Sequence, residues 1–352
     1  MLFNAMELVH ENSISAISLL QNRFDQSSNL MFLISTLFDP RYAFLFYAPL
    51  LYSIDRYTGR KLMWVAAISE WSNQILKWIL HGERPYWWIH ETSVYNKTSL
   101  PDVQQFFITC ETGPGSPSGH AMVTASVWYI LIESFLRKRS VDASKNSLAN
   151  RLAWSFYTII LAVVSLSRVY IAAHFPHQCF LGGIIGVAVA MIISNLDTDS
   201  LSRRGYVLGG VGLFASAIMT YVSLRAIGVD PMWSVDRALK WCVKREYVHL
   251  DTTPFFSVMR YVGFFIGMGL GLTSSWSKSA SKVTFTTPMK IVSAILALGV
   301  CKASEYIKIP MVNLVFFYGA ALVINMILPY IFVAIIPYLV SKLSFTSKAK
   351  ST

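Results

Sequence analysis

Long apolar runs separated by short polar connections recur along the whole chain. Each run holds roughly 20 residues, the length that a helix needs to cross a bilayer. Only 14% of the residues are charged, whereas soluble domains carry about 25%. The chain is therefore predicted to be an all-α, multi-pass membrane protein that forms one domain over residues 1–352. We place about nine helices at residues 30–51, 61–80, 119–136, 152–171, 178–195, 206–226, 254–273, 290–307 and 311–340.

The formal net charge of +11 is carried mainly by the connections between the apolar runs. No basic patch interleaved with aromatic residues is visible, so nucleic acid is not an expected partner. Basic residues concentrate in alternate connections, as they do in the cytosolic loops of membrane proteins. This pattern places the N-terminus and residues 81–118, 172–177 and 227–253 on the far, lumenal side, and the C-terminus in the cytosol. The cytosolic set comprises Arg56, Arg60 and Lys61; Arg137, Lys138, Arg139, Lys145 and Arg151; Arg203 and Arg204; and Lys278, Lys282 and Lys290.

The chain has one N-glycosylation sequence, Asn96-Lys97-Thr98. It falls in the segment 81–118, and glycans are added on the lumenal side. Asn96 is therefore predicted to be glycosylated, in agreement with the charge pattern. Of the four cysteines, Cys110 and Cys242 fall in two segments of this same side, which allows a disulfide without determining the pairing.

Two glycines and two prolines stand in the segment 112–117, and they exclude a regular helix there. An apolar run follows over residues 121–136. Ser118 can cap the helix that begins here, and Gly119 lets a ligand approach the main chain. The unpaired amides and the dipole of a helix N-terminus favour a bound anion. We therefore predict a phosphate site at Ser118 and Gly119, with His120 beside it as a proton donor.

Lys77 and Arg84 flank the lumenal end of the second helix and stand seven residues apart. Seven residues are nearly two helical turns, which predicts that both side chains lie on one face. Cations at a helix end often extend to the membrane surface, but positive charge is disfavoured on the lumenal side. No carboxylate stands at a matching spacing, so the pair indicates an anionic ligand.

Arg168 closes the fourth helix, and Pro176 suits the first turn of the fifth. His174 therefore lies in a short lumenal connection beside Arg168. A single histidine in such a place is usually structural, and we assign His177 to that class. His174 differs because the predicted topology brings it to the same side as the two cations and the histidine described above.

Residues 39–41, Asp-Pro-Arg, interrupt the first apolar run. A local ion pair at a proline kink explains them as well as a functional role does. An acid that faces the site could bind sugar hydroxyls or hold one of the cations, so Asp39 is predicted to be either sugar-binding or structural. The aromatic run Tyr86-Trp87-Trp88 fits a sugar pocket or an interfacial aromatic belt, and we favour the belt.

Three motifs occur in a fixed order: Lys-x6-Arg-Pro from Lys77, Pro-Ser-Gly-His from Pro117, and Ser-Arg-x5-His from Ser167. Together they resemble the signature of the type 2 phosphatidic acid phosphatase and vanadium haloperoxidase superfamily. The stretches 77–80, 84–88, 110–122, 172–178 and 248–255 are similar to the glucose-6-phosphatase catalytic subunit family. The resemblance covers the chain nearly end to end, including the nine-helix layout, and implies a helical core of the type 2 phosphatase kind.

This resemblance implies an enzyme that hydrolyses glucose-6-phosphate to glucose and phosphate. His174 would be the nucleophile and form a phosphohistidine, while His120 would protonate the departing sugar oxygen and then activate water. The cationic side chains would neutralise the phosphoryl oxygens. No carboxylate cluster suited to Mg²⁺ or Zn²⁺ is apparent, so no metal and no cofactor are expected. The phosphate ligands implied are Lys77, Arg84, Ser118, Gly119 and Arg168.

The C-terminal tail carries Lys348 and Lys350, fifth and third from the end. This spacing is similar to lysine-based retrieval signals of endoplasmic reticulum membrane proteins, although a basic cytosolic tail explains it nearly as well. The expected location is the endoplasmic reticulum membrane, with a lumenal active site. Because glucose-6-phosphate is made in the cytosol, the expected partners are this substrate, a glucose-6-phosphate transporter and the lipid bilayer.

Two alternatives remain open at this stage. One is a weakly active relative, or a phosphatase of another sugar phosphate or of a lipid phosphate. Lipid phosphatases share the three motifs but typically have six helices. The other is an anion transporter or binding protein that uses the cations without chemistry. That alternative leaves the pairing of His120 with His174 unexplained and lacks an inverted repeat.

Overall fold

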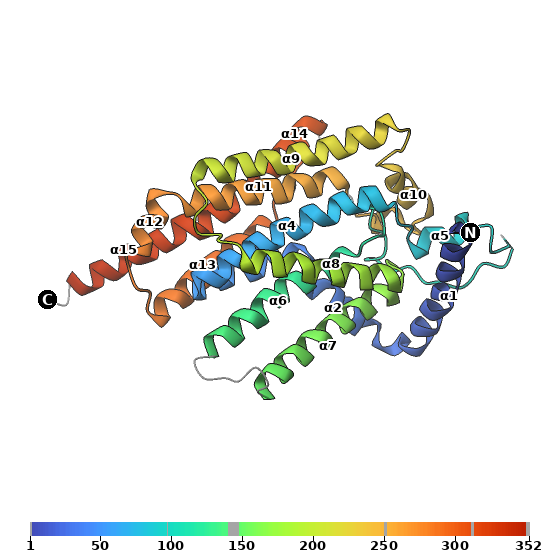
Figure 1. Ribbon diagram of the computed structural model, residues 1–352, viewed down its shortest axis with the longest axis horizontal. Coiled ribbons are helices and arrows are strands. Elements are labelled where there is room, and N and C mark those ends of the chain that lie inside the picture. The colour runs from blue at the N-terminus through green and yellow to red at the C-terminus, as the bar shows by residue number, and fades with distance from the viewer. Residues whose placement is uncertain (1, 97, 140–147, 250–251, 311–312, 350–352) are drawn as a thin grey trace. The chain divides into compact units, whose positions relative to one another are not determined.

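The computed structural model describes residues 2–96, 98–139, 148–249, 252–310 and 313–349 (Figure 1). Most of these residues lie in helices and none forms a strand of a sheet, so the expected all-α class is confirmed. The extended pairing recorded among them is one isolated parallel bridge between Glu111 and His249. The chain divides into two compact units, residues 1–40, 72–188 and 219–257 in unit 1, and residues 41–71, 189–218 and 258–352 in unit 2. The single domain over residues 1–352 stays a prediction.

Unit 1 contains the segments that carry the three motifs. Its long helices are α6 and α7, which pack against each other, and most of α8. Shorter elements include α5 and α10, which also pack together. The helices that contribute to unit 1 are α1 (Leu2–Arg23), α2 (Ser28–Leu37), α4 (Arg56–Leu80), α5 (Pro85–Glu91), α6 (Gly119–Arg139), α7 (Leu148–Tyr170), α8 (Pro176–Asn195), α9 (Arg203–Ala226) and α10 (Trp233–Trp241), with short 3-10 turns at Asp25–Ser27 and Arg245–Tyr247.

The core of unit 1 is rich in aromatic side chains. Tyr86, Trp87 and Trp88 are buried there, together with Phe175 from the connection between α7 and α8. Large buried aromatic rings dominate the energetics of such a core. The preference for an interfacial belt was therefore wrong, because these rings face the protein interior and hold α5 against the connection that carries His174.

Unit 2 contains the C-terminal helices and parts of α4, α8 and α9. Its helix α13 packs against α3 and α15. Gly267 allows α11 and α14 to approach closely, since a Cβ atom there would overlap the carbonyl oxygen of Met326. The elements of unit 2 include a π-helix (Ala43–Tyr47), α3 (Ala48–Ile54), α11 (Pro254–Leu272), α12 (Ser275–Ser281), α13 (Thr287–Ser304), α14 (Leu314–Tyr330), a second π-helix (Ile331–Ile335) and α15 (Ile336–Ala349).

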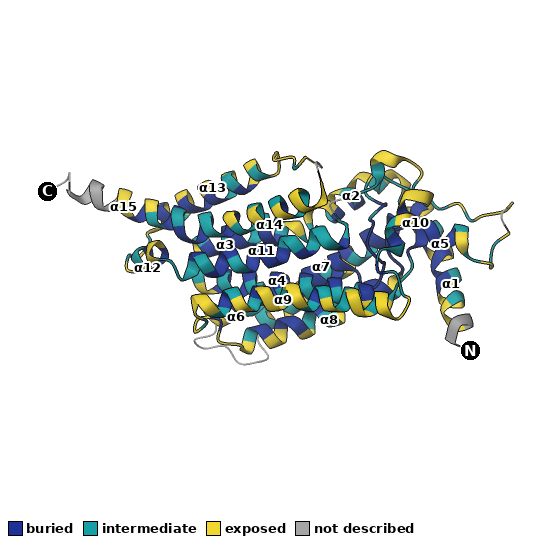
Figure 2. Ribbon diagram, turned by 90° about the horizontal axis from the view of Figure 1, so that it is seen from above, coloured by how far each residue is buried: buried dark blue, intermediate teal, exposed yellow. Residues whose placement is uncertain are grey.

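Seven helices in the described residues are long and apolar enough to cross a membrane. These helices differ in how much of their apolar surface is covered by the protein. In α6, 67% of the apolar window is buried, whereas in α9 only 11% is buried, as expected of a helix that faces lipid. Figure 2 shows exposed residues along α9, and several of them are large and apolar, such as Leu208 and Met219. The seven segments are Gly119–Lys138, Leu148–Tyr170, Pro176–Asn195, Arg203–Ala226, Pro254–Leu272, Thr287–Ser304 and Leu314–Leu343.

The count of about nine helices is not confirmed, and the difference lies in the first two. The run 30–51 is not one helix, because α2 ends at Leu37 before Asp39 and Pro40. Proline cannot continue the helical hydrogen bonds, and it disfavours helical geometry in the residue before it. The run 61–80 forms the 25-residue helix α4. However, Lys61, Glu70 and Lys77 lie along α4, and it is not among the seven apolar helices.

Candidate active site

The first motif lies where α4 ends and the chain turns. His81 adopts a left-handed conformation with φ of 49°, and residues 81–84 are not helical. Arg84 is the N-cap of α5, which begins at Pro85. The expected common helix face for Lys77 and Arg84 was therefore wrong, because the helix ends at Leu80. The turn at His81 and Gly82, rather than helical periodicity, directs Arg84.

Arg84 is fully buried, and its guanidinium group binds the two loops on either side of it. Its Nε donates to the carbonyl oxygen of Gly113 at 2.7 Å, and Nη2 donates to that of Pro114 at 3.2 Å. Its Nη1 donates to the carbonyl oxygen of Ala173 at 3.0 Å and lies 3.5 Å from Nε2 of His174. The planar guanidinium group has five N–H donors, which suits it to such a position. Arg84 thus connects the glycine-rich loop to the connection that carries His174.

His174 has a defined orientation. Its Nδ1 lies 2.7 Å from the carbonyl oxygen of Gly115 and 3.3 Å from Oε1 of Gln178. Both oxygens are acceptors, so Nδ1 carries the proton and Nε2 keeps a lone pair. Burial lowers the pKa of His174 well below its usual value, and the nearby Arg84 guanidinium lowers it further. His174 is therefore a neutral imidazole whose Nε2 can act as a nucleophile.

The Pro-Ser-Gly-His motif forms the start of α6. The amide of Ala121 donates to Oγ of Ser118 at 3.5 Å, which agrees with the expected helix cap. The amide of Ser118 itself donates to the carbonyl oxygen of Gln178 at 3.0 Å. Ser118 therefore does not offer this amide to an anion in the present arrangement. A Cβ atom at Gly119 would lie 3.1 Å from Oδ1 of Asn73, so the main chain is close to α4 there.

The third motif brings Arg168 to the same place from the end of α7. Arg168 is buried, and its Nη1 donates to Oγ of Ser35 at 2.6 Å. Its Nη2 donates to Oε1 of Glu111. Lys77 lies close enough to contribute to the low pKa of His174. The structure thus brings Arg84, His120, Arg168, His174 and Lys77 into one neighbourhood of unit 1.

Glu111 stands at the centre of these groups and has no counterpart among the residues expected from sequence. Its Oε2 lies 3.0 Å from Nη2 of Arg84 and 3.9 Å from Nε2 of His174. Its Oε1 pairs with Arg168 and lies 3.8 Å from Nδ1 of His120. Burial opposes the charge on Glu111, but Arg168 and Arg84 outweigh it and hold the pKa of this carboxyl well below its usual range. The carboxylate is therefore ionised.

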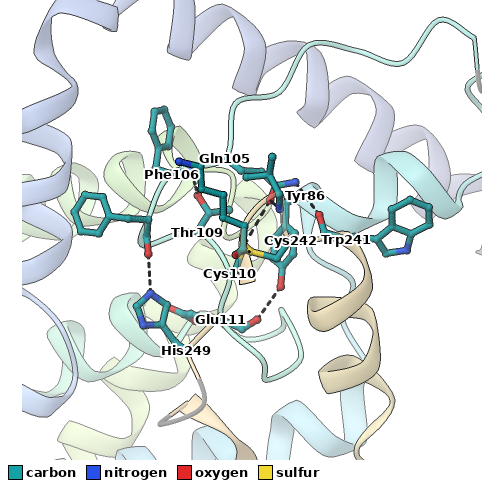
Figure 3. Close-up of a disulfide and its surroundings, with 12 residues drawn as sticks. Tyr86, Gln105, Phe106, Thr109, Cys110, Glu111, Trp241, Cys242 and His249 are labelled. Carbon is teal, nitrogen blue, oxygen red and sulfur yellow. Dashed lines mark hydrogen bonds between the residues drawn. A yellow bond between two sulfur atoms is a disulfide. The ribbon is translucent and has the colours of Figure 1, made fainter. Parts of the chain in front are cut away.

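The main chain at Glu111 is held by contacts with Cys242 and His249. Cys110 forms a disulfide with Cys242, which lies beside Glu111 (Figure 3). The amide of His249 donates to the carbonyl oxygen of Cys110 at 3.1 Å. Figure 3 also shows Tyr86, whose hydroxyl donates to the carbonyl oxygen of Glu111 at 3.0 Å. The disulfide that the sequence allowed is present, and it fixes the start of the glycine-rich loop.

The remaining sequence expectations are placed as follows. Asp39 follows α2 and lies within electrostatic range of His120. Its neighbour Pro40 would lie 3.9 Å from a Cβ atom at Gly119, so this turn is close to the start of α6. His177 stacks with His10 and Phe175, in agreement with the structural role expected for it. Asn96 is exposed. Lys350 and the side chain of Lys348 lie outside the described residues.

Within the described residues, no group of three or more histidine, cysteine, aspartate or glutamate side chains could hold a metal ion. The groups present suit a different ligand. Two buried arginines, two histidines and a nearby lysine suit an anion of phosphate size. The neutral Nε2 of His174 faces Arg84 and Glu111. Its lone pair can attack a phosphoryl group that is bound between these cations.

Comparison with known proteins gives the same result from a separate direction. Residues 58–201 match the family model described as "PAP2 superfamily", and this range contains all three motifs. The chain is 36% identical to "Glucose-6-phosphatase catalytic subunit 1" of Rattus norvegicus over 98% of this chain and 99% of that protein. It is 42% identical to the protein of that name from Haplochromis nubilus, over 84% and 83%. It is 36% identical to "Glucose-6-phosphatase 2" of Homo sapiens, over 98% and 100%. No solved structure matches.

Proposed function

The chain belongs to the glucose-6-phosphatase catalytic subunit family, and on this premise we propose that it hydrolyses glucose-6-phosphate to glucose and phosphate. The observation that carries the proposal is the environment of His174. Its Nδ1–H donates a hydrogen bond to the carbonyl oxygen of Gly115, and its Nε2 lies 3.5 Å from Nη1 of Arg84. A neutral nucleophile beside fixed cations is what phosphoryl transfer requires.

In the first step, Nε2 of His174 attacks the phosphorus atom. The bond between phosphorus and the sugar oxygen breaks, and the phosphoryl group passes to the imidazole. The departing oxygen takes a proton from His120. Arg84 and Arg168, with Lys77, neutralise the phosphoryl oxygens, and this fixed positive charge stabilises the transition state without reorganisation.

In the second step, water attacks the phosphohistidine. His120 now accepts the proton of this water, and the bond between phosphorus and Nε2 breaks. Phosphate leaves, and His174 returns to its neutral form. Gly119 remains the proposed main-chain contact to phosphate. Ser118 is retained for the same role only if phosphate binding frees its amide from the carbonyl oxygen of Gln178, to which it donates at 3.0 Å.

The test measures phosphate released from glucose-6-phosphate by wild type and His174→Ala in detergent-opened microsomes. His177→Gln is the matched control, because this histidine lies three residues along the chain and stacks on Phe175 instead of facing the cations. We expect activity in wild type and in the control, and none in His174→Ala. Mannose-6-phosphate and phosphatidic acid are assayed beside it. Activity on the lipid alone would assign a lipid phosphatase. A folded protein that hydrolyses none of the three substrates would point to an anion transporter or binding protein.

Asp39 is proposed to bind sugar hydroxyls or to hold the site's cations. Its electrostatic coupling to His120 supports the proposal. We expect Asp39→Asn to raise KM for glucose-6-phosphate or to lower kcat. Retained activity with unchanged substrate affinity would remove Asp39 from the site.

The protein is a membrane protein by its apolar helices, and we propose that it lies in the endoplasmic reticulum membrane with the site facing the lumen. A separate glucose-6-phosphate transporter would then supply the substrate. The exposed Asn96 supports lumenal placement of its segment. Treatment with endoglycosidase should increase the mobility of wild type but not of Asn96→Gln. Equal mobility before and after treatment of wild type would contradict the proposed orientation.

A further inference from the structure

The carboxylate of Glu111 occupies the place where a phosphoryl group would have to lie. One of its oxygens lies 3.0 Å from Arg84 and 3.9 Å from the nucleophilic Nε2 of His174. The other pairs with Arg168 and lies 3.8 Å from Nδ1 of His120. An anion between the two arginines and the two histidines is the arrangement that the reaction demands of its substrate.

Phosphate and this carboxylate need the same donors. Nη2 of Arg84 and Nη2 of Arg168 are the atoms that face Glu111. Nε and Nη1 of Arg84 donate to main-chain carbonyl groups, and Nη1 of Arg168 donates to Ser35. Nε of Arg168 is buried and has no hydrogen-bond partner among the described residues. A phosphate anion bound to the same two guanidinium groups would also be repelled strongly by the carboxylate of Glu111 in a buried site. Glu111 and a bound phosphoryl group therefore exclude each other from this position.

Glu111 is also the member of the group that is most open to solvent. Its side chain is 12% exposed, against 0% for Arg84, 2% for Arg168, 0% for His174 and 8% for His120.

The main chain at Glu111 cannot move aside easily. Its neighbour Cys110 is fixed by the disulfide to Cys242, and the amide of Thr112 donates to Oγ1 of Thr252 at 3.1 Å. The carbonyl oxygen of Glu111 accepts a hydrogen bond from Tyr86. Displacement must therefore come from rotation of the side chain, which sp³ torsions permit between staggered positions.

We propose that Glu111 is a displaceable internal anion that occupies the phosphate position when the site is empty and competes with phosphate for Arg84 and Arg168. This proposal rests on the proposed function, since it concerns the same site. In the absence of substrate, the carboxylate neutralises two buried guanidinium groups. Without it, these two charges would be buried and unpaired, which costs free energy of folding. Its return after hydrolysis displaces the product phosphate and limits product inhibition.

A purely structural role predicts the opposite effect of removing this charge. If Glu111 only held the two arginines in position, its loss would disorder them and weaken the binding of any anion. If Glu111 is a competitor, its loss leaves the arginines uncompensated and strengthens anion binding. The sign of the change in affinity therefore separates the two roles.

The experiment measures binding of inorganic phosphate to the purified full-length protein in detergent by calorimetry. The variants are Glu111→Gln, which keeps the shape and removes the charge, and Glu91→Gln as the matched control. Glu91 pairs with Arg237 at 2.8 Å and accepts a hydrogen bond from Trp241, so it carries a paired carboxylate outside the site. We expect Glu111→Gln to bind phosphate about tenfold more tightly than wild type, and the control to be unchanged. Equal or weaker binding by Glu111→Gln would overturn the proposal.

If Glu111→Gln shows no cooperative unfolding transition and is therefore misfolded, Glu111→Asp is used in its place. The shorter side chain keeps its charge but withdraws from the arginines, so tighter phosphate binding than wild type is again expected, and equal or weaker binding overturns the proposal. Binding of phosphate requires no turnover. If wild type fails to hydrolyse glucose-6-phosphate, the proposed function is rejected. The phosphate-binding measurement still decides whether Glu111 competes with phosphate.

Discussion

The proton on Nδ1 of His174 is directed at the carbonyl oxygen of Gly115, 2.7 Å away. This main-chain contact joins His174 of the third motif to a residue of the glycine-rich loop that lies 59 residues earlier in the chain. A carbonyl group has a fixed direction and cannot exchange protons, so it holds one tautomer of the imidazole. The lone pair on Nε2 is consequently directed at Arg84 and the carboxylate of Glu111.

The first prediction concerns acid sensitivity. Burial and Arg84 hold the pKa of His174 in the folded protein well below the value of about 6.5 expected in the unfolded chain. Between these two values only the unfolded state binds the proton, so stability falls as pH falls below about 6.5. The loss is about 1.4 kcal/mol per pH unit. Thermal unfolding at about pH 7.5 and pH 5.5 should therefore show a smaller loss for His174→Gln than for wild type. An identical loss in both would show that His174 is not the group responsible.

The second prediction concerns Gly115. A Cβ atom there would overlap the carbonyl oxygen of Glu83 and lie 2.9 Å from Oε1 of Gln178. Gly115→Ala must shift the carbonyl group that holds His174, and a displacement of about 1 Å can cost about 100-fold in rate. Gly183 in α8 is the control, because a Cβ atom there meets nothing within 4 Å. Its replacement by alanine should leave kcat unchanged and raise stability by about 0.5–1 kcal/mol. Equal kcat in the two variants would contradict the prediction.

The third prediction concerns Gln178. Its Nε2 donates to the carbonyl oxygen of Glu83 at 2.7 Å, and its Oε1 accepts from the amide of Phe175 at 3.2 Å. It thus positions the connection around His174 without facing the arginines. Gln178→Ala should lower kcat about 10- to 100-fold while KM changes little. Gln74→Ala is the control, since it removes another buried glutamine whose Nε2 has no partner among the described residues. A rise in KM with unchanged kcat would assign Gln178 to binding instead.

The fourth prediction concerns the disulfide. Cys110 and Cys242 are bonded, whereas Cys179 and Cys301 are free. The denatured, unreduced protein should therefore label at two thiols, and the reduced protein at four. Cys242→Ser should lower the free energy of unfolding by about 2–5 kcal/mol and lower activity, because Cys110 adjoins Glu111. Cys301→Ala should remove one labelled thiol and keep activity. Four labelled thiols without reductant would contradict the pairing.

Much of this molecule could be predicted from the order of its residues. The apolar runs predicted an all-α membrane protein, and the end of α7 and the start of α8 at Pro176 agree with the expected connection around His174. The first two helices were harder, because Asp39 and Pro40 divide one run and charged residues interrupt the other. Average hydropathy does not show whether such a segment crosses a bilayer or packs inside the protein.

The site was less predictable than the fold because its orienting contacts come from the main chain. The carbonyl oxygens of Gly113, Pro114, Gly115 and Ala173 hold Arg84 and His174, and every residue type carries a carbonyl group. The sequence does contain one indication of Glu111, since this acid directly precedes the glycine-rich loop, which was expected to lie near several cations. Spacing alone could not distinguish it from an acid on the surface.

The bond between Cys110 and Cys242 spans 132 residues, and this separation constrains how the protein is made. The helices α6, α7, α8, α9 and α10 lie between the two cysteines, so all five must be synthesised before the second thiol exists. Until that moment the segment at Glu111 lacks this attachment. The covalent constraint on that segment is therefore added only after the chain has been synthesised through Cys242.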